Sequence, residues 1–292
     1  MCCFGGGVRE FESIGFIDLQ KTGTTTIAKA LLQVLDEKEV YKHVHGPVPA
    51  QFNRTKLYFV SVREPLSLYI SLFNFGTGQR RGALYDSLSR KGLKHLFQPT
   101  IEAFESWLEF MLDPASAPLL NRRYGDSAPF ESLGLLSIRL LYVSLPNFAK
   151  RARKDKIRKP EDIRDYFEKK HVFDDYVRTE HLIGDLFAYL QRHSARLRLR
   201  RPLTNIEEFS AIARTRNTST KIPGLTPSVV SPQLQKRVRE REWLFYEAFG
   251  YDTDPKGRPP ESVRLAESAR EGGQEKGGSD QCAGLPVGPK QA

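Results

Sequence analysis

Cysteine is almost missing from the body of this 292-residue chain, because Cys2, Cys3 and Cys282 all lie in the terminal segments. This distribution argues against a disulfide framework and against a cysteine metal site in the folded part. The sequence also has no apolar run of about 18 residues or more, so no transmembrane helix is predicted. A cleavable signal-peptide pattern and internal repeats are missing as well. These absences are typical of a soluble globular protein.

The charge is strongly unbalanced, with 45 Lys and Arg against 35 Asp and Glu and a formal net charge of +10. Such a surplus favours an acidic partner: a nucleic acid, a phosphorylated cofactor, an anionic glycan or a membrane surface. Charge alone does not choose among them. The hydrophobic content of 39% is ordinary and is enough for a real core.

Alternating strand-like and helix-like patterns predict an α/β fold. Apolar or β-branched runs at 14–19, 40–45 and 57–63 read as strands, and helices follow at 24–36 and from Pro65 to a stop at Gly76. This order predicts a P-loop-like three-layer fold with a central, mostly parallel sheet flanked by helices. Further elements are expected as helices at 101–112, 132–145 and 231–250, and as a strand and a helix capped by Thr179 within 173–190.

The domain boundaries follow from composition. Residues 1–13 form a short N-terminal segment, 14–251 one domain, and 252–292 a tail rich in Gly, Pro, Ser and charge. The tail has no apolar periodicity, and we predict that it is disordered.

The segment FIDLQKTGTTTIAKALL at 16–32 has the pattern of a strand, a small polar loop and a helix. The loop carries Lys21, Gly23 and four threonines, namely Thr22, Thr24, Thr25 and Thr26. A helix N-terminus with free N–H groups, a glycine, a lysine and hydroxyl donors makes a phosphate cradle. It differs from the G-x-x-x-x-G-K-[ST] loop of NTPases, because the lysine precedes the glycine. The alternative is a plain polar turn capped by threonines.

A second stretch, SVREPLSLYIS at 61–71, favours the phosphate cradle. Arg63 ends the strand at 57–63, and Ser71 lies two turns into the next helix. Parallel strands end at one edge of a sheet, where ligands bind in α/β folds. Arg63 and Ser71 are therefore predicted to hold a second phosphate, apart from the first.

Three stretches together resemble the sulfotransferases that use 3′-phosphoadenosine-5′-phosphosulfate (PAPS). They are QKTGTTT at 20–26, REPLSLYIS at 63–71 and NTSTKIPG at 217–224 followed by FYEAFGY at 245–251. Their order and spacing agree with the family across residues 14–251. The Golgi carbohydrate branch, with its heparan sulfate and uronyl 2-O-sulfotransferases, is the most similar, since His43-Val44-His45 follows the second strand as in that branch. Leu68 departs from the branch, which usually has an arginine there.

The resemblance implies a role for each matching residue. Lys21 would stabilise charge on the bridging oxygen as the bond breaks, and N–H groups from Thr22 to Thr25 would hold the 5′-phosphate. Arg63 and Ser71 would grip the 3′-phosphate. A further set would contact the nucleotide from the C-terminal loop, unless that loop is merely a polar linker: Asn217, Ser219 and Lys221.

The base that deprotonates the acceptor is expected to be a histidine. His43 and His45 lie two residues apart on an extended segment, so both side chains face one way, and an imidazole titrates near neutral pH. His45 is favoured over His43, with Glu64 as a fallback; either histidine could instead be structural. No metal is expected, since the pair lacks a third ligand.

Other functions stay open. A P-loop kinase or NTPase would need the G-x-x-x-x-G-K-[ST] motif, which this sequence does not contain. A nucleic-acid-binding module would need a stacking motif, which it also lacks. A sulfotransferase-like protein that binds the product nucleotide (PAP) without turnover differs only in activity. The expected acceptor is an anionic glycan or another hydroxyl-bearing molecule. The resemblance implies the Golgi, with a membrane anchor that this chain does not carry, or the cytoplasm if the chain is complete.

Overall fold

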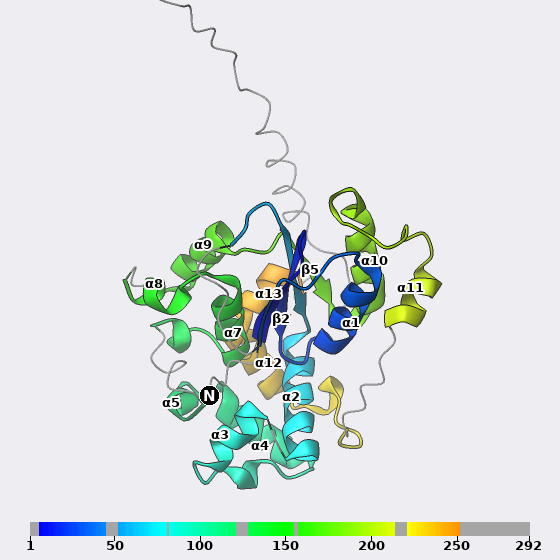
Figure 1. Cartoon of the computed structure of the whole chain (residues 1–292). Helices are drawn as coiled ribbons and strands as arrows, with labels where there is room; N and C mark the ends of the chain where they lie inside the picture. Colours follow the sequence, from blue (N-terminus) through cyan, green and yellow to red (C-terminus); the bar gives the residue numbers. More distant parts are fainter. Residues whose placement is uncertain are drawn as a thin grey trace, which may run out of the picture. The chain divides into compact units, whose positions relative to one another are not determined.

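A five-stranded mixed sheet lies at the centre of the computed structural model, which describes residues 6–44, 52–80, 82–120, 128–154, 157–213 and 221–251 (Figure 1). The strand order is β3-β1-β2-β4-β5. The strands are β1 Gly6–Glu10, β2 Ile14–Leu19, β3 Tyr41–Val44, β4 Leu57–Val62 and β5 Asp175–Arg178. Six consecutive buried residues in β4 explain its position inside the sheet, since both of its faces are covered.

The sheet is parallel on one side and antiparallel on the other. β2, β4 and β5 pair in parallel, whereas β1 is antiparallel to both β2 and β3. The sheet is therefore mixed, and the predicted mostly parallel pairing holds only for β2, β4 and β5. A tight turn, in which the Phe11 N–H donates to the Ile14 carbonyl, joins β1 to β2. β1 was not predicted, because GGVRE has one large apolar residue, Val8, and the strand is defined by pairing on both sides.

The helices of the described residues follow these bounds: α1 Thr24–Val34, α2 Pro65–Gln79, α3 Ala83–Ser89, α4 Ile101–Leu112, α5 Ala117–Leu120, α7 Leu135–Ser144, α8 Phe148–Lys154, α9 Pro160–Lys170, α10 Leu182–Arg192, α11 Ile206–Ala213, α12 Pro232–Arg241 and α13 Trp243–Phe249. Short 3₁₀ turns lie at Lys94–Leu96, Pro114–Ser116, Ala128–Glu131, Thr179–His181, Ser194–Arg196 and Pro227–Val229. The described helices include none that is both long and apolar enough to span a bilayer.

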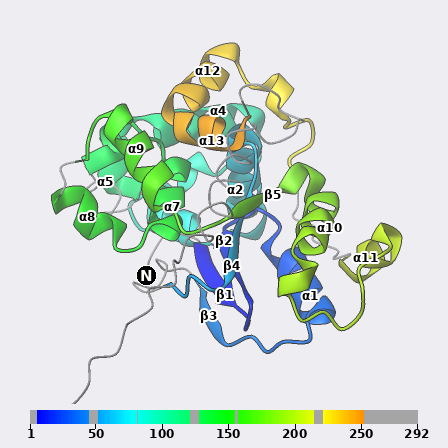
Figure 2. The same ribbon diagram turned by 90° about the horizontal axis from the view of Figure 1, so that it is seen from above.

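Helices cover both faces of the sheet (Figure 2). On one face α1, α10 and α11 share a core with β2, β4 and β5, in which the Phe59 ring lies 5.0 Å from Phe16 and 4.8 Å from Tyr189 between centroids. On the other face α7 packs against β1 and β2. α7 is buried along its whole length, which explains why its sequence is apolar on nearly every side.

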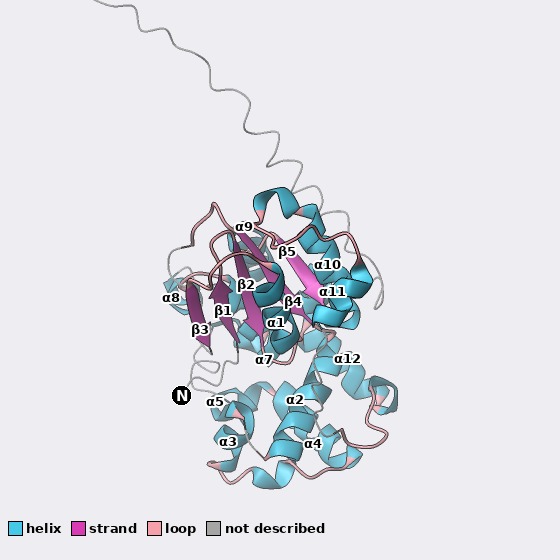
Figure 3. Cartoon of the chain, turned by 45° about the vertical axis from the view of Figure 1, so that its right-hand side comes forward, coloured by secondary structure: helices cyan, strands magenta, loops and turns pink. Residues whose placement is uncertain are grey.

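α2 continues from the end of β4 into a group of helices with α3, α4 and α5, beyond the sheet (Figure 3). The stop predicted at Gly76 is wrong, since α2 runs on to Gln79. Gly76 is buried, and a Cβ there would come within 2.8 Å of the Phe97 ring. Its small size therefore serves close packing, while Arg80, in the left-handed region at φ 46°, ends the helix.

Two other predicted helix ends also differ. The single helix expected at 231–250 is divided at Glu242, whose side chain turns toward the N-terminus of α7. Gly250, in the left-handed region at φ 66°, ends α13 as predicted. Thr179 does not cap α10, because its hydroxyl donates to the Val62 carbonyl at 2.8 Å and α10 begins later, at Leu182.

Candidate functional site

The loop between β2 and α1 has two departures from ordinary backbone geometry, on either side of Thr22. Lys21 has a φ of 70° and Gly23 one of 85°. Glycine adopts this conformation freely, and a Cβ at position 23 would lie 2.6 Å from Leu182. A lysine at positive φ is strained by about 1–2 kcal/mol. Such strain persists where the surrounding structure imposes it, and it gathers at functional sites.

The threonines of the loop divide into two kinds. Thr22 is fully buried, and its hydroxyl is bound to the Leu19 carbonyl and the Ser61 hydroxyl, while its N–H also donates to Leu19. The expectation that the Thr22 hydroxyl faces a ligand is therefore wrong. Thr24 donates to the Asp18 carboxylate, whereas Thr25 is exposed. Thr22 and Thr24 fix the loop on the sheet, and the Thr22–Ser61 contact joins it to β4.

The N-terminus of α1 opens at this loop. Gly23 is the N-cap and provides no side-chain acceptor for the first-turn N–H groups. The N–H groups of a first helical turn have no partner within the helix, and they carry the positive end of its dipole. The N–H groups from Thr22 to Thr25 are predicted to hold the 5′-phosphate. For Thr22 this is wrong, because its N–H donates to Leu19. The residues from Gly23 to Thr26 surround the N-terminus of α1 and have the backbone geometry of an anion site.

Lys21 extends from this loop toward α2. Its Nζ lies 4.2 Å from the centroid of the Phe75 ring, a cation–π contact. Burial lowers the pKa of Lys21, and the like charge of Arg63 lowers it further. The second effect requires the two cations to be close in space, although 42 positions separate them in the chain, which is the difference between their residue numbers. The parallel pairing of β2 and β4 explains this, because the two strands end side by side.

Arg63 follows β4 directly and is half-buried. Burial lowers its pKa, while the carboxylates of Glu180 and Glu64 raise it. Both carboxylates have other partners. Glu64 caps α2 by accepting from the N–H groups of Leu66 and Ser67, and it also accepts from the Tyr246 hydroxyl at 2.8 Å. Glu64 is thus a structural cap, which weighs against its fallback role as a base.

Glu180 lies in the 3₁₀ turn that follows β5, and its carboxylate connects the neighbour of Arg63 with the C-terminal segment. It accepts from the Glu64 N–H at 2.9 Å and from the Tyr251 hydroxyl at 3.2 Å. Within the described residues, neither Lys21 nor Arg63 forms an ion pair. Half-buried cations without a paired carboxylate cost free energy on folding, and an anion bound at this edge of the sheet would offset that cost.

Ser71 lies on α2 and is half-buried. It follows Pro65, the first residue of α2, by six positions, roughly 9 Å along the helix axis. Ser71 therefore lies beyond Arg63 on the helix that leaves the same sheet edge, which is consistent with a second anion position separate from the loop of Lys21.

β3, which contains His43, ends at this edge too. His43 lies in β3 opposite Val8, and the next residue, Val44, is opposite Gly7, which in turn pairs with Asp18 of β2. Two strand spacings, roughly 10 Å, separate β3 from β2. The predicted residues His45, Asn217 and Ser219 lie outside the described residues. Lys221 is exposed and lines a cavity beside α2 rather than the loop of Lys21.

Phe75, Glu180 and Tyr251 belong to the site but were not predicted. Phe75 lies in the aromatic stretch FNFG of α2, which was a usable signal. Glu180 approaches from a distant part of the chain, and no local pattern marks it. Tyr251 ends the predicted FYEAFGY stretch, but its hydrogen bond to Glu180 is not visible in the sequence. The described residues contain no group of three or more His, Cys, Asp or Glu side chains able to hold a metal.

Comparison of the chain with family models, with curated proteins and with solved structures gave no match. The chemistry of the site therefore has to be argued from its own residues.

Proposed function

We propose that this protein is a PAPS-dependent sulfotransferase that transfers the sulfuryl group to a hydroxyl of a carbohydrate acceptor. The observation that carries the proposal is the pair of half-buried cations, Lys21 and Arg63, which form no ion pair among the described residues. They lie close enough for the charge of Arg63 to lower the pKa of Lys21, in addition to the larger effect of burial. A ligand with two separate anionic groups would neutralise both. The helices on both faces of the sheet support a P-loop-like three-layer fold as the scaffold.

PAPS, when bound, would supply a sulfuryl group whose bond to the 5′-phosphate breaks, so that the phosphate is the leaving group. The residues of this chain bind and orient PAPS. The first-turn N–H groups of α1 would bind the 5′-phosphate, and Lys21 would neutralise the negative charge that develops on the bridging oxygen as the sulfuryl group leaves. The strained loop positions both the N–H groups and Lys21 before the donor binds. Arg63 and Ser71 hold the 3′-phosphate. Positioning and electrostatics are what such a transfer requires, as in phosphoryl transfer.

The acceptor hydroxyl needs a base, and the segment of His43 and His45 is proposed to provide it. β3 runs parallel to β2, as follows from two successive antiparallel pairings, and it ends at the same edge. A neutral imidazole there would accept the acceptor proton at physiological pH. His45→Ala and His43→Ala would then lower turnover while leaving nucleotide affinity unchanged.

A thermal-shift titration with PAP, ADP, ATP and magnesium-ATP tests the proposal. A ligand at a hundredfold its Kd stabilises by about 2.7 kcal/mol, which raises Tm by roughly 5–10 °C for a domain of this size. We expect a rise with PAP that exceeds the others and is lost in Lys21→Ala and in Arg63→Ala. Lys170→Gln, on the exposed end of α9, is the matched control and keeps the full response.

No response to PAP, or an equal response to magnesium-ATP, would overturn the proposal and return the kinase or NTPase alternative. A specific response to PAP without any sulfuryl transfer to glycan acceptors would instead identify a non-catalytic PAP-binding protein.

A further inference from the structure

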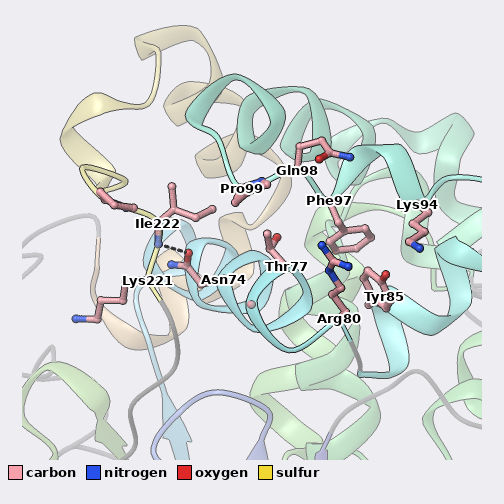
Figure 4. Close-up of a pocket in the computed structure, with 12 residues that line it drawn as sticks. Asn74, Thr77, Arg80, Tyr85, Lys94, Phe97, Gln98, Pro99, Lys221 and Ile222 are labelled. Atoms are coloured by element: carbon pink, nitrogen blue, oxygen red, sulfur yellow. Dashed lines mark hydrogen bonds between the residues drawn. The ribbon is translucent and has the colours of Figure 1, made fainter.

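A cavity of about 360 Å³ opens beside the second half of α2, apart from Lys21 and Arg63 (Figure 4). Asn74 and Thr77 of α2 line it, together with residues 97–99 and 221–223. Its volume falls within the range of about 300–1,000 Å³ that is usual for small-molecule sites. We call this cavity the α2 pocket. From Ser71 to Thr77 the helix advances by roughly 9 Å, so the α2 pocket lies beyond the predicted 3′-phosphate position.

The walls of the α2 pocket are fixed by contacts between distant chain segments. The Ile222 N–H donates to the side-chain amide oxygen (Oδ1) of Asn74 at 3.0 Å, which connects the segment after residue 220 to α2. On the opposite side the Phe97 ring packs edge-on against Tyr85 at 4.9 Å between centroids and stacks on Phe73 at 6.0 Å. The pocket is therefore part of the packed structure and not a gap between loosely placed side chains.

The charge around the α2 pocket is of one sign. Arg80, Lys94 and Lys221 line it, and no acidic residue does so among the described residues. None of these three cations forms an ion pair within the same part of the chain. Figure 4 shows Arg80 and Lys94 at the aromatic end and Lys221 at the opposite end. Cations of this kind attract and orient an anionic ligand.

One polar group in the lining also has no partner. The hydroxyl of Thr77 is shielded from solvent and makes no hydrogen bond within the described residues. Asn74 and Thr77 lie three positions apart on one face of α2, so the hydroxyl and the amide belong to the same wall. A buried hydroxyl without a partner is uncommon in folded proteins and calls for an explanation.

We propose that the α2 pocket binds a ring that carries an anionic group. The anion is held by the cations at the rim, the ring lies against Phe97 and Tyr85, and a ring substituent or the anion itself bonds the Thr77 hydroxyl. This site goes beyond the proposed nucleotide site, because neither Lys21 nor Arg63 lines it. The ring is of either aromatic or sugar type, and both fit the same combination of cations and aromatic edges.

Calorimetric titration with phenyl sulfate and with glucose 6-sulfate tests the proposal and distinguishes the two types of ring. Phenol and glucose are the neutral controls. We expect at least one ring sulfate to bind and its neutral counterpart not to. The variant Arg80→Asn/Lys94→Gln/Lys221→Gln should weaken binding by about tenfold, since three exposed charge contacts are removed. Asparagine is chosen at position 80 because it tolerates the positive φ there.

Two further variants make the result decisive. Thr77→Val should weaken binding without lowering Tm, because it removes a hydroxyl that has no partner in the free protein. Lys21→Ala should leave the affinity for the ring sulfate unchanged, even though it abolishes the response to PAP. The proposal is overturned if neither ring sulfate binds or if the neutral rings bind equally well. It is also overturned if Lys21→Ala weakens binding of the ring sulfate and the triple variant does not.

Discussion

Two regions of this protein bury charge in opposite ways. At the sheet edge, Lys21 and Arg63 are half-buried without an ion pair among the described residues, and Lys21 has a strained backbone. At the break between α12 and α13, Glu242 is fully buried, yet it accepts hydrogen bonds from the Tyr69 hydroxyl, the Leu136 and Ser137 N–H groups and the Ser137 hydroxyl.

The difference separates charge that stabilises the fold from charge that we propose to be used for a ligand. Every oxygen of Glu242 is used, and Gly134 leaves space for it, since a Cβ there would lie 2.0 Å from the carboxylate. Glu242 thereby fixes α7 and α2 to the C-terminal helices. Lys21 and Arg63 do not connect helices in this way, so no ion pair among the described residues offsets the free energy that their burial costs. Removing Glu242 should affect stability, and removing the cations should affect binding.

The largest effect is expected from Glu242→Ala. Three residues would lose the acceptor of their buried donors, and such a loss costs about 3–5 kcal/mol, or a fall in Tm of roughly 10–15 °C. Glu242→Gln keeps the shape and one acceptor oxygen and should cost less. Urea unfolding and PAP titration of both variants provide the measurement. A Glu242→Ala protein that unfolds like the wild type, or that remains folded but loses PAP affinity, would remove the distinction between the regions.

A smaller effect, a gain in stability relative to the alanine variant, is expected from Lys21→Gly. Glycine relieves the positive φ of position 21, so this variant should be more stable than Lys21→Ala by about 1 kcal/mol, while both lose PAP binding. The comparison with alanine cancels the loss of the charge and of the contact with Phe75. If urea unfolding gives equal stabilities, or a less stable glycine variant, then the loop is not strained and the argument from its geometry fails.

The smallest effect is the dependence of stability and of PAP affinity on pH. Because the pKa of Lys21 is lowered in the folded protein, the unfolded chain binds more protons than the folded one between that pKa and about 10.5. The contribution of Lys21 to stability therefore rises with pH across this window, while PAP binding falls as the ammonium loses its proton.

Lys21→Arg is the matched variant for this prediction, since arginine stays charged over the whole window. The difference between the wild type and Lys21→Arg in PAP affinity, measured from neutral pH to about pH 10, isolates residue 21 from other titrating groups. Parallel pH profiles for the two proteins would contradict the assigned proximity of Lys21 to the ligand.

The sequence was sufficient to predict an element whose structure is determined by its own residues. The buried strand at 57–63 and the amphipathic helix at 101–112 correspond to β4 and α4. The position of Lys21 and Arg63 at one edge of the sheet was predicted as well, because parallel strands end at one edge. These predictions need only the local pattern and one rule of topology.

The sequence was insufficient where distant contacts decide. β1 is a strand because two neighbours pair with it, Gly76 stays inside α2 because Phe97 covers it, and Glu242 interrupts a helix because its carboxylate bonds α7. In the site, Glu180 and Tyr251 approach Arg63 from other elements. No window of the sequence contains these relations, since each depends on packing between separate segments.

The most direct test of the central idea, two cations kept for two anionic groups of one ligand, is a calorimetric cycle that varies protein and ligand together. PAP, adenosine 5′-phosphate and adenosine 3′-phosphate are titrated into the wild type, Lys21→Ala and Arg63→Ala. We predict that Lys21→Ala weakens only ligands with a 5′-phosphate and Arg63→Ala only those with a 3′-phosphate. Losses that are the same for all three ligands, or no loss in either variant, would contradict this assignment of the two cations.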